Sequence, residues 1–371
     1  MEPVLWSIKY RPKQWDDFFG IELTLQHLKN LAESSTCPNI ILYGSEGTGK
    51  TAASKVFVKS FLGDDVSTNY LRLNIRDITS YNISDAKRDV KALAKLDRSD
   101  RMPLDEYMSI IYKQAKASLK TRGISRRPSK KQLLQEAISY FASTYTVTDT
   151  KVKILVLDEA DALSYSMQQA LRRTMEIYNE VCRFILITPT LAGWSPAIIS
   201  RCVTIHFPSA SDAVAKSLIH HIANNEGLEI ENPALEALVR QADGNLRKAI
   251  HILQIAATGS KKITEDTIYS ASETHLQKRI HEMVSFAIDG QHVKARKIMM
   301  RLLGYEQYST DEVVSEMKED LLKRPLSHSM LIEMIERLAE IDSRIGHGKN
   351  DFIHLSACFA SFARIAKAHE S

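Results

Sequence analysis

Cysteine is scarce in this sequence, and long apolar runs are missing. The 371 residues include four cysteines, which lie far apart and form no Cys-x-x-Cys pair: Cys37, Cys182, Cys202 and Cys358. This spacing disfavours a zinc site or a disulfide framework and is typical of a reducing compartment. No apolar run approaches the ~18 residues that a membrane-spanning helix needs, and the first residues lack the basic-then-apolar pattern of a signal peptide. We therefore expect an intracellular, soluble protein with no membrane partner.

Excess charge is small overall, but it is concentrated in one segment. The net charge is +4 at pH 7. The segment 113–131 contains no acidic residue and eight basic ones: Lys113, Lys116, Lys120, Arg122, Arg126, Arg127, Lys130 and Lys131. Without these eight residues the rest of the chain has a net charge of −4. The segment is either a solvated insertion or a surface that contacts a phosphate backbone, and the sequence leaves both interpretations open.

What the chain does contain is an alternation of strand-like and helix-like segments over its first two hundred residues. A hydrophobic fraction of 44% and a charged fraction of 25% are those of a globular protein. The alternation predicts an α/β fold, a parallel sheet with helices on both faces. Strands are expected at 40–43, 70–75, 153–157, 184–187 and 203–207, and helices between them include 23–31 and 167–178.

Helical patterns replace this alternation after residue 208. Helices are expected at 211–225, 232–242 and 245–257, and the chain is helical from about residue 263 to its end. A chain of this length is expected to form two or three domains. We predict an α/β domain at 1–208, a small helical domain at 209–270 and an all-α domain at 271–371.

Two segments need a particular explanation. The stretch 97–150 is far longer than an ordinary connection of ~4–6 residues. We interpret it as an insertion between two strands, helical at 104–119 and 131–145. The last helix, 352–366, is apolar on more than one face and must be buried. Either a bundle core or another chain could cover it.

The segment from Gly44 to Thr51 fits the phosphate-binding pattern Gly-x-x-x-x-Gly-Lys-Thr, between an expected strand and an expected helix. Its glycines let backbone N–H groups turn toward a phosphate chain, and the helix N-terminus adds a favourable dipole. Lys50 is expected to reach the outer phosphates, and Thr51 to ligate Mg²⁺. The predicted nucleotide-binding residues here are Gly44, Ser45, Glu46, Gly47, Thr48, Gly49, Lys50, Thr51 and Ala52.

A second motif lies at 153–161, where an apolar strand ends in acidic residues. The strand is expected to deliver Asp158 beside the phosphate loop, where its carboxylate can hold Mg²⁺ through water molecules. Glu159 is then placed to polarise an attacking water molecule. Downstream of a Gly-Lys-Thr loop, this pair predicts nucleotide hydrolysis.

Together with five further segments, these motifs resemble the small subunits of replication factor C, the clamp loader of the AAA+ ATPase superfamily. Nearly the whole chain apart from the insertion shares the resemblance, which leans toward an archaeal second small subunit. The segments are Ile-Lys-Tyr-Arg-Pro-Lys at 8–13, Gln-Gln-Ala-Leu-Arg-Arg-Thr-Met-Glu at 168–176, Ser-Arg-Cys at 200–202, Gly-Asn-Leu-Arg-Lys-Ala at 244–249 and Gly-Lys-Asn-Asp-Phe-Ile at 348–353.

The resemblance implies a RecA-like AAA+ domain, a helical lid and an oligomerising helical collar, and it implies further site residues. Tyr10, Arg11 and Pro12 are expected to line the adenine pocket. Arg201 is expected to act in trans on the γ-phosphate held by a neighbouring subunit. Arg247 is expected to contact the phosphates in cis from the lid.

The implied activity is that of a DNA-dependent ATPase that works in the assembled complex. With ATP and Mg²⁺ it would open a sliding clamp and load it onto primer–template DNA. The expected partners are other clamp-loader subunits in a hetero-oligomer, expected to be a pentamer, together with the clamp and the DNA. The compartment would be the cytoplasm of an archaeon or the nucleus of a eukaryote. Phosphate-backbone contacts are expected on one helix, from Lys87, Arg88 and Lys91, although a solvated helix face explains these three residues as well.

The sequence departs from the family in three places. Pro189, flanked by Thr188 and Thr190, stands where the family has the sensor 1 asparagine, and a proline has no backbone donor. Ser45 and Glu46 stand where two prolines are usual. The basic insertion is not a regular family feature.

Two alternatives follow from these observations. The first is a structural subunit that binds nucleotide with little or no hydrolysis and donates Arg201 to an active neighbour. The second is another AAA+ machine, such as a branch-migration helicase, which the Ser200–Cys202 triplet and the helical C-terminal region disfavour. The sequence leaves open the subunit order, the copy number and the surface that touches the clamp.

Overall fold

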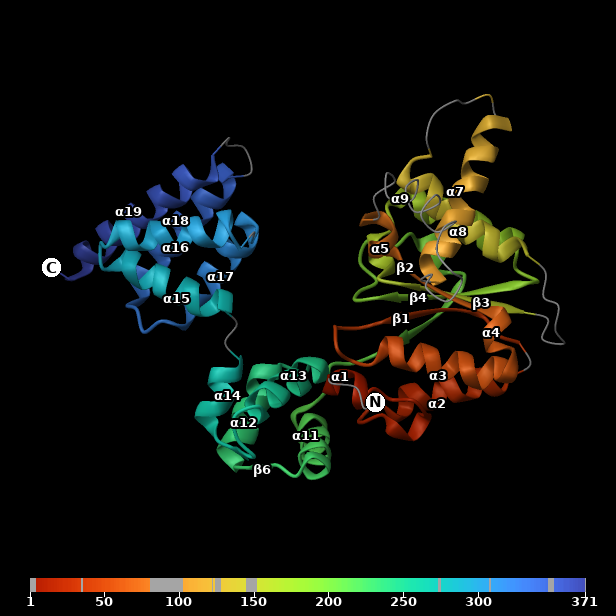
Figure 1. The fold of residues 1–371 in the computed structure, drawn as a ribbon, viewed down its shortest axis with the longest axis horizontal. Coiled ribbons are helices and arrows are strands. Elements are labelled where there is room, and N and C mark those ends of the chain that lie inside the picture. Colours follow the sequence, from red (N-terminus) through yellow and green to blue (C-terminus); the bar gives the residue numbers. More distant parts are fainter. Residues whose placement is uncertain are drawn as a thin grey trace. The chain divides into compact units, whose positions relative to one another are not determined.

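The computed structural model describes residues 5–34, 36–80, 103–121, 123, 128–144, 152–272, 275–306, 308–345 and 350–370. The chain forms two compact units, Met1–Ile268 and Tyr269–Ser371. Each unit has hydrophobic clusters of its own: two lie on opposite faces of a sheet in the first unit, and one fills the second unit. Figure 1 shows the elements of both units.

A five-stranded parallel sheet is the centre of the first unit, with strand order β2-β3-β4-β1-β5. The sequence predicted all five strands, and they are confirmed with small changes at their ends. Their bounds are β1 Asn39–Tyr43, β2 Tyr70–Asn74, β3 Lys153–Asp158, β4 Cys182–Thr188 and β5 Cys202–His206.

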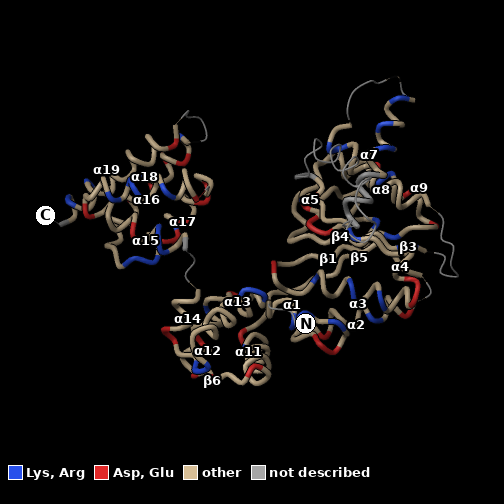
Figure 2. Tube along the Cα trace, viewed as in Figure 1, with Lys and Arg blue, Asp and Glu red and all other residues tan. Residues whose placement is uncertain are grey.

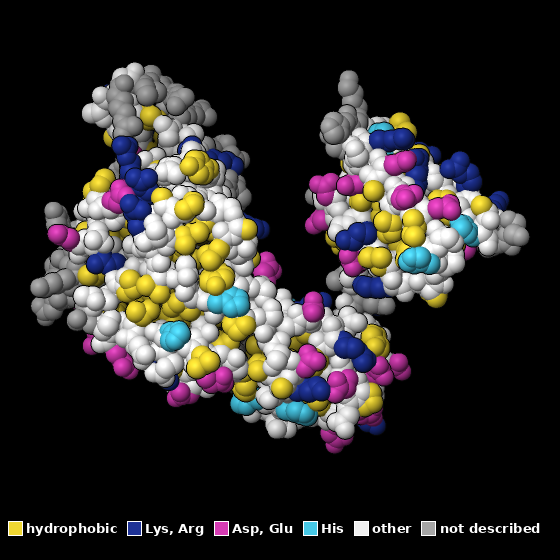
Figure 3. All heavy atoms as spheres, turned by 180° about the vertical axis from the view of Figure 1, so that it is seen from behind, with side chains coloured by type: hydrophobic (Ala, Val, Ile, Leu, Met, Phe, Trp, Pro, Cys, Tyr) yellow, Lys and Arg dark blue, Asp and Glu magenta, His cyan; other side chains and the backbone are white. Residues whose placement is uncertain are grey.

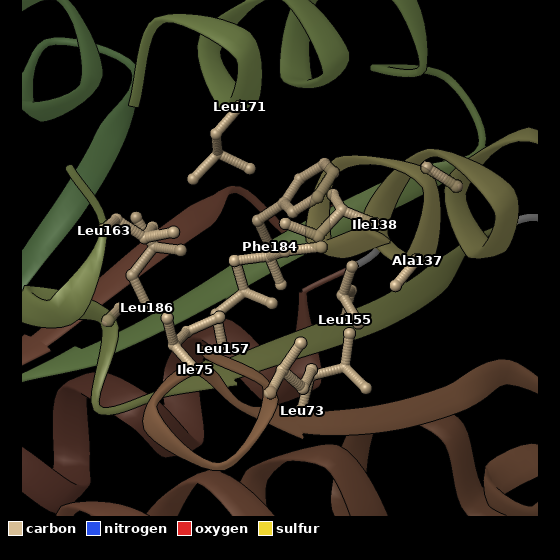
Figure 4. Packing of buried hydrophobic residues seen from close by; sticks show 14 of the residues in the cluster. Leu73, Ile75, Ala137, Ile138, Leu155, Leu157, Leu163, Leu171, Phe184 and Leu186 are labelled. Carbon is tan, nitrogen blue, oxygen red and sulfur yellow. The ribbon is translucent and has the colours of Figure 1, made fainter. Parts of the chain in front are cut away.

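Successive residues of the strands face opposite sides of the sheet. Leu155 and Leu157 of β3 belong to one cluster, whereas Ile154 and Val156 belong to the other. The first cluster lies under α5, α7, α8 and α9, and Figure 4 shows its packing; the second lies under α2 and α3. The bounds of these helices are α2 Glu22–Glu33, α3 Lys50–Leu62, α5 Ile75–Ser80, α7 Pro103–Thr121, α8 Lys130–Ser143 and α9 Tyr165–Ile177.

The predicted insertion is built into this domain. Its two predicted helices are α7 and α8, which pack against each other. Ser129 and Gln132 form a reciprocal capping box at the start of α8. Ala137 and Ile138 of α8 are buried against the sheet (Figure 4), so this helix contributes to the core. Among its described residues the α/β region also contains short elements: α1 Trp6–Lys9, η1 Trp15–Asp17, η2 Gly63–Asp65, α4 Val66–Asn69, η4 Ala160–Ala162 and α10 Pro196–Ile199.

The small lid region follows β5 and is helical, as the sequence predicted, except for one short sheet. Its helices are α11 Asp212–Glu226, α12 Asn232–Ala242, α13 Leu246–Ala257 and α14 Glu265–Ser272. Two strands that the sequence did not predict, β6 Glu229–Ile230 and β7 Lys262–Ile263, pair in parallel. Two residues are too few to show a strand periodicity, and the pairing joins residues about thirty positions apart.

The second unit is an all-α bundle. Where the structure describes this unit, its helices are α15 His275–Ile288, α16 His292–Gly304, α17 Thr310–Lys323, α18 His328–Ile345 and α19 Asp351–Glu370. The last helix is buried through Leu355, Cys358, Phe359 and Phe362, and it contacts α15, α16 and α18. A bundle core therefore accounts for its several apolar faces. Among the residues that the structure describes, none of the helices combines the length and the hydropathy needed to cross a membrane.

Candidate nucleotide site

The phosphate loop connects the end of β1 to the start of α3 and has a backbone that its glycines allow. Gly44, Gly47 and Gly49 have φ values of 146°, 75° and 92°, which residues with a Cβ rarely adopt. A Cβ on Gly44 would lie 1.9 Å from the carbonyl oxygen of Phe207. The loop therefore brings backbone N–H groups to the N-terminus of α3, where an anion is favoured.

Lys50 lies almost buried under this loop. Its Nζ donates hydrogen bonds to the carbonyl oxygens of Gly44 at 2.6 Å and Ser45 at 2.5 Å. Burial lowers the pKa of Lys50, while Glu46 and Asp158 oppose that shift. The ammonium group thus holds the loop in its curled form and lies beside the space that phosphates would occupy.

Asp158 ends β3 next to the first turn of α3. Its Oδ2 accepts a hydrogen bond from Thr51 Oγ1 at 3.1 Å, and its Oδ1 accepts one from the backbone N–H of Glu159, also at 3.1 Å. Hydroxyl and carboxylate oxygens are ligands that Mg²⁺ prefers. The donor set of Thr51 and Asp158 therefore fits this ion. Glu159 follows with a left-handed backbone, at a φ of 52°.

Two arginines that the sequence analysis missed are paired with the acidic residues. Arg72 of β2 donates to Asp158 Oδ2 from Nη2 at 2.6 Å and from Nε at 3.1 Å. Arg76 of α5 donates from Nη2 to Asp161 Oδ2 at 2.8 Å, and its Nε lies 3.6 Å from Glu159 Oε2. Only the strand order, with β2 beside β3, could have indicated the Arg72–Asp158 pair.

The region expected to supply sensor 1 has no free hydroxyl at its first threonine. Thr188 is 1% exposed; its Oγ1 donates to the carbonyl of Thr190 at 2.9 Å and accepts from Trp194 Nε1 at 3.2 Å. Pro189 lines the pocket, and its carbonyl accepts a hydrogen bond from the N–H of Gly44 at 3.2 Å. Backbone contact with the phosphate loop is thus retained, but position 189 has no side-chain donor.

A cavity of about 250 Å³ brings together most of the predicted site residues. Apolar residues that the sequence analysis did not name, including Phe18, Ile21 and Ile250, form part of its wall. Of the predicted nucleotide-binding and catalytic residues, Gly44, Ser45 and Arg201 are not in the lining. Those that line it are Tyr10, Arg11, Pro12, Glu46, Gly47, Thr48, Gly49, Lys50, Thr51, Ala52, Asp158, Glu159 and Arg247.

Tyr10 connects the N-terminal segment 8–13 to helix α11 of the lid region. Its hydroxyl donates to Glu226 Oε1 at 2.5 Å, and Lys9 Nζ lies 3.0 Å from the same oxygen. Burial and the Glu226 carboxylate raise the pKa of Tyr10 to about 12. One side of the cavity is therefore tied to the lid by a charge-assisted hydrogen bond.

Arg201 lies between α10 and β5. Its guanidinium is bonded to Glu176 of α9, with 2.8 Å between Nη2 and Oε1, and the side chain is 37% exposed. The predicted Lys87, Arg88 and Lys91 lie outside the described residues.

Comparisons with known proteins cover nearly the whole chain. Models of three known families match: the AAA domain at 32–193, the RFC1-like AAA+ ATPase lid domain at 213–270 and the Replication factor C C-terminal domain at 276–361. The Replication factor C small subunit of Archaeoglobus fulgidus is 30% identical over 364 residues, which are 98% of each chain. That of Methanocella arvoryzae is 29% identical over 361 residues, 97% of each chain.

A solved structure of low sequence identity has a similar fold. The Aeropyrum pernix ORC1 protein in complex with DNA has a TM-score of 0.50 and 20% identity. The match covers 89% of this chain and 84% of that one. At this identity the likeness concerns the fold alone.

Proposed function

The chain belongs to the replication factor C small-subunit family of AAA+ proteins, and from that premise we propose that it binds and hydrolyses ATP within a clamp loader. The observation that carries this proposal is the phosphate loop over buried Lys50, with Thr51 and Asp158 bonded to each other beside it. In the proposed function, ATP binding and hydrolysis drive the opening of a sliding clamp and its loading onto primer–template DNA.

Different residues of the cavity bind the phosphates, hold the metal ion and orient the attacking water. The loop N–H groups and Lys50 hold the phosphates, and Thr51 with Asp158 would hold Mg²⁺. The ion, when bound, neutralises charge on the transferred phosphoryl group. Glu159 orients the attacking water. In the free chain the exposed Arg76 guanidinium lies near this carboxylate, with 3.6 Å between its Nε and Glu159 Oε2.

The lid provides a route by which bound nucleotide changes the protein's shape. The Asn245 side chain packs against Gly47, where an added Cβ would lie 1.8 Å from its Oδ1. Ser45 Oγ and Ser209 Oγ are 2.8 Å apart, and Arg247 lines the same cavity. Phosphates that order the loop would therefore reposition these lid contacts, and ATP would favour one conformation by differential contacts.

Arg201 is proposed to serve a neighbouring subunit. It is absent from the lining of its own chain's cavity, which supports action in trans. A guanidinium stabilises the charge that develops during phosphoryl transfer. Hydrolysis would then require assembly with other clamp-loader subunits, proposed to be a pentamer.

Contact with DNA is proposed to follow exposed basic residues. Lys113, Lys116 and Lys120 of α7 are exposed, whereas Ile111, Ala115 and Leu119 are buried. Figure 2 shows the basic residues along α7, and Figure 3 shows Lys and Arg side chains on the first unit seen from behind. Such a face can follow a phosphate backbone without reading bases. Lys87, Arg88 and Lys91 remain part of this proposal.

A structural subunit with weak hydrolysis is the second candidate. The hydroxyl of Thr188 is engaged with Thr190 and Trp194, and Pro189 offers no donor to an attacking water. Both observations favour a chain that binds ATP but turns it over slowly while its Arg201 serves a neighbour.

ATP turnover by the chain alone and in the assembled complex, with clamp and primed DNA, tests both candidates. Lys50→Ala and Glu159→Gln are compared with the unaltered chain. Negligible turnover alone, a rise on assembly and a loss in both variants would support the hydrolysing subunit. Turnover of the complex that is unchanged by Glu159→Gln but lost with Arg201→Ala would support the structural subunit.

A further inference from the structure

The carboxylate that should serve a divalent ion is already bonded to a cation of its own chain. Asp158 Oδ2 accepts hydrogen bonds from two nitrogens of Arg72, the closer at 2.6 Å, and from Thr51 Oγ1. Oδ1 accepts from the N–H of Glu159. Both carboxylate oxygens are thus engaged by groups of the protein.

The sheet geometry places Arg72 beside Asp158. Leu71 and Leu73 pack into the cluster on one face of β2, so Arg72 faces the opposite side, where α3 and Asp158 lie. The parallel register pairs Asn74 with Asp158, and the Arg72 side chain, starting two residues earlier, is long enough to reach the end of β3.

The Arg72–Asp158 ion pair is largely shielded from water. The Asp158 side chain is 8% exposed and that of Arg72 is 34% exposed. A carboxylate with so little contact with water needs a compensating charge, and a guanidinium that donates two hydrogen bonds to one carboxylate is a strong partner. A divalent ion would have to share Asp158 with this guanidinium or displace it.

We propose that Arg72 is an internal counter-ion of the nucleotide site, so that the chain binds ATP or ADP almost equally well with and without Mg²⁺. This inference rests on the proposed nucleotide-binding function. Arg72 neutralises Asp158 beside the phosphate loop permanently, whereas Mg²⁺ neutralises it only when bound, so without either cation the Asp158 carboxylate repels the phosphates. Replacing Arg72 by a neutral residue frees Asp158 for the ion and makes binding depend on it.

Equilibrium binding of a fluorescent ATP analogue to the full chain, in excess Mg²⁺ and in excess EDTA, tests the inference. For the unaltered chain the two dissociation constants should differ by less than about threefold. For Arg72→Gln they should differ by about tenfold or more, with weaker binding in EDTA. Arg72→Lys keeps the charge and should stay close to the unaltered chain. Arg240→Gln, which removes an exposed guanidinium paired with Glu265 on the lid, is the matched control and should leave the ratio unchanged.

Mn²⁺ binding to the ADP complex, followed by the electron paramagnetic resonance signal of free Mn²⁺, is the second readout. Arg72→Gln should bind Mn²⁺ more tightly than the unaltered chain, and thermal unfolding checks that the variant is folded. An unaltered chain whose affinity falls tenfold or more in EDTA would overturn the inference even if Arg72→Gln failed to fold. Absence of nucleotide binding under both conditions would instead overturn the proposed function, and the inference with it.

Discussion

Arg201 and Glu176 form an ion pair within one chain, with 2.8 Å between Nη2 and Oε1. The same carboxylate oxygen accepts a hydrogen bond from Arg172 Nε at 3.1 Å, and Arg201 Nη1 donates to the carbonyl of Ala197 at 2.7 Å. These two arginines lower the pKa of Glu176, chiefly through the Arg172 hydrogen bond. The guanidinium proposed to act on a neighbour is therefore held in a defined direction before any neighbour is present.

Replacement of Arg201 by alanine should lower ATP turnover at the neighbouring site by about 10³-fold. Nucleotide binding by the altered chain itself should not change, because Arg201 does not line its own cavity. Single-turnover hydrolysis by the assembled complex and equilibrium nucleotide binding separate the two effects. Glu176→Gln keeps Arg201 but removes the ion pair that orients it, and it should lower ATP turnover at the neighbouring site only a few-fold. A loss of nucleotide affinity by the Arg201→Ala chain alone would contradict action in trans.

The phosphate loop, all five sheet strands and the helical character of the C-terminal half were predictable from local sequence. The Gly44–Thr51 pattern and the strand before Asp158 each lie within one short segment, and their chemistry requires those residue types. Arg72 and Arg76 were not predictable in the same way. Arg72 is 86 positions from Asp158, and only the adjacency of β2 and β3 brings the two together.

Two further features depended on tertiary structure rather than on local pattern. Strands β6 and β7 contain two residues each and exist because they pair with each other. The engagement of Thr188 by Trp194 could not be read from their spacing, since both residues lie around an irregular turn. Local periodicity predicts elements, but it does not specify which side chains meet.

Gly44→Ala should destabilise the first unit and abolish nucleotide binding. The new Cβ would lie 1.9 Å from the Phe207 carbonyl oxygen, and the φ of 146° disfavours any side chain. Displacement of the loop should cost about 1–3 kcal/mol of unfolding free energy. Gly259→Ala is the control, since a Cβ added at that position would meet no atom within 4 Å, and it should change stability by less than about 0.5 kcal/mol. Urea unfolding of both variants measures the difference, and equal values would refute this steric account.

The Tyr10–Glu226 hydrogen bond should make stability depend on pH. The Glu226 carboxylate accepts hydrogen bonds from Tyr10 and Lys9, and these lower the pKa of Glu226 below its ordinary value of 4.5. The contribution is therefore present above pH 4.5 and is lost as the pH falls through the lower folded value. At alkaline pH the raised pKa of Tyr10, about 12, has the opposite effect. The contribution of Tyr10 to the free energy of unfolding is complete below pH 10 and is lost as the pH rises toward 12.

Tyr10→Phe should remove this hydrogen bond at a cost of about 1–2 kcal/mol near neutral pH. The variant should also lose less stability than the unaltered chain when the pH falls from about 6 to about 3. Chemical unfolding at several pH values measures both effects. Parallel stability curves for the two proteins across that range would show that Glu226 gains nothing from Tyr10.

Pro189→Asn should raise ATP turnover in the assembled complex, if the missing donor is what limits hydrolysis. Position 189 lines the cavity, and the hydroxyl of the adjacent Thr188 is already engaged with Thr190 and Trp194. Asparagine keeps the backbone carbonyl that accepts from Gly44 and adds a side-chain amide. One well-placed donor is worth about 10²–10³-fold at other enzyme sites, so a rise of about tenfold is expected for an amide added without further optimisation. Pro189→Ala removes the ring without adding a side-chain donor and should leave ATP turnover unchanged. Equal turnover rates for Asn and Ala at position 189 would show that another residue limits hydrolysis. Arg72, which is bonded to Asp158, would then be the next residue to alter.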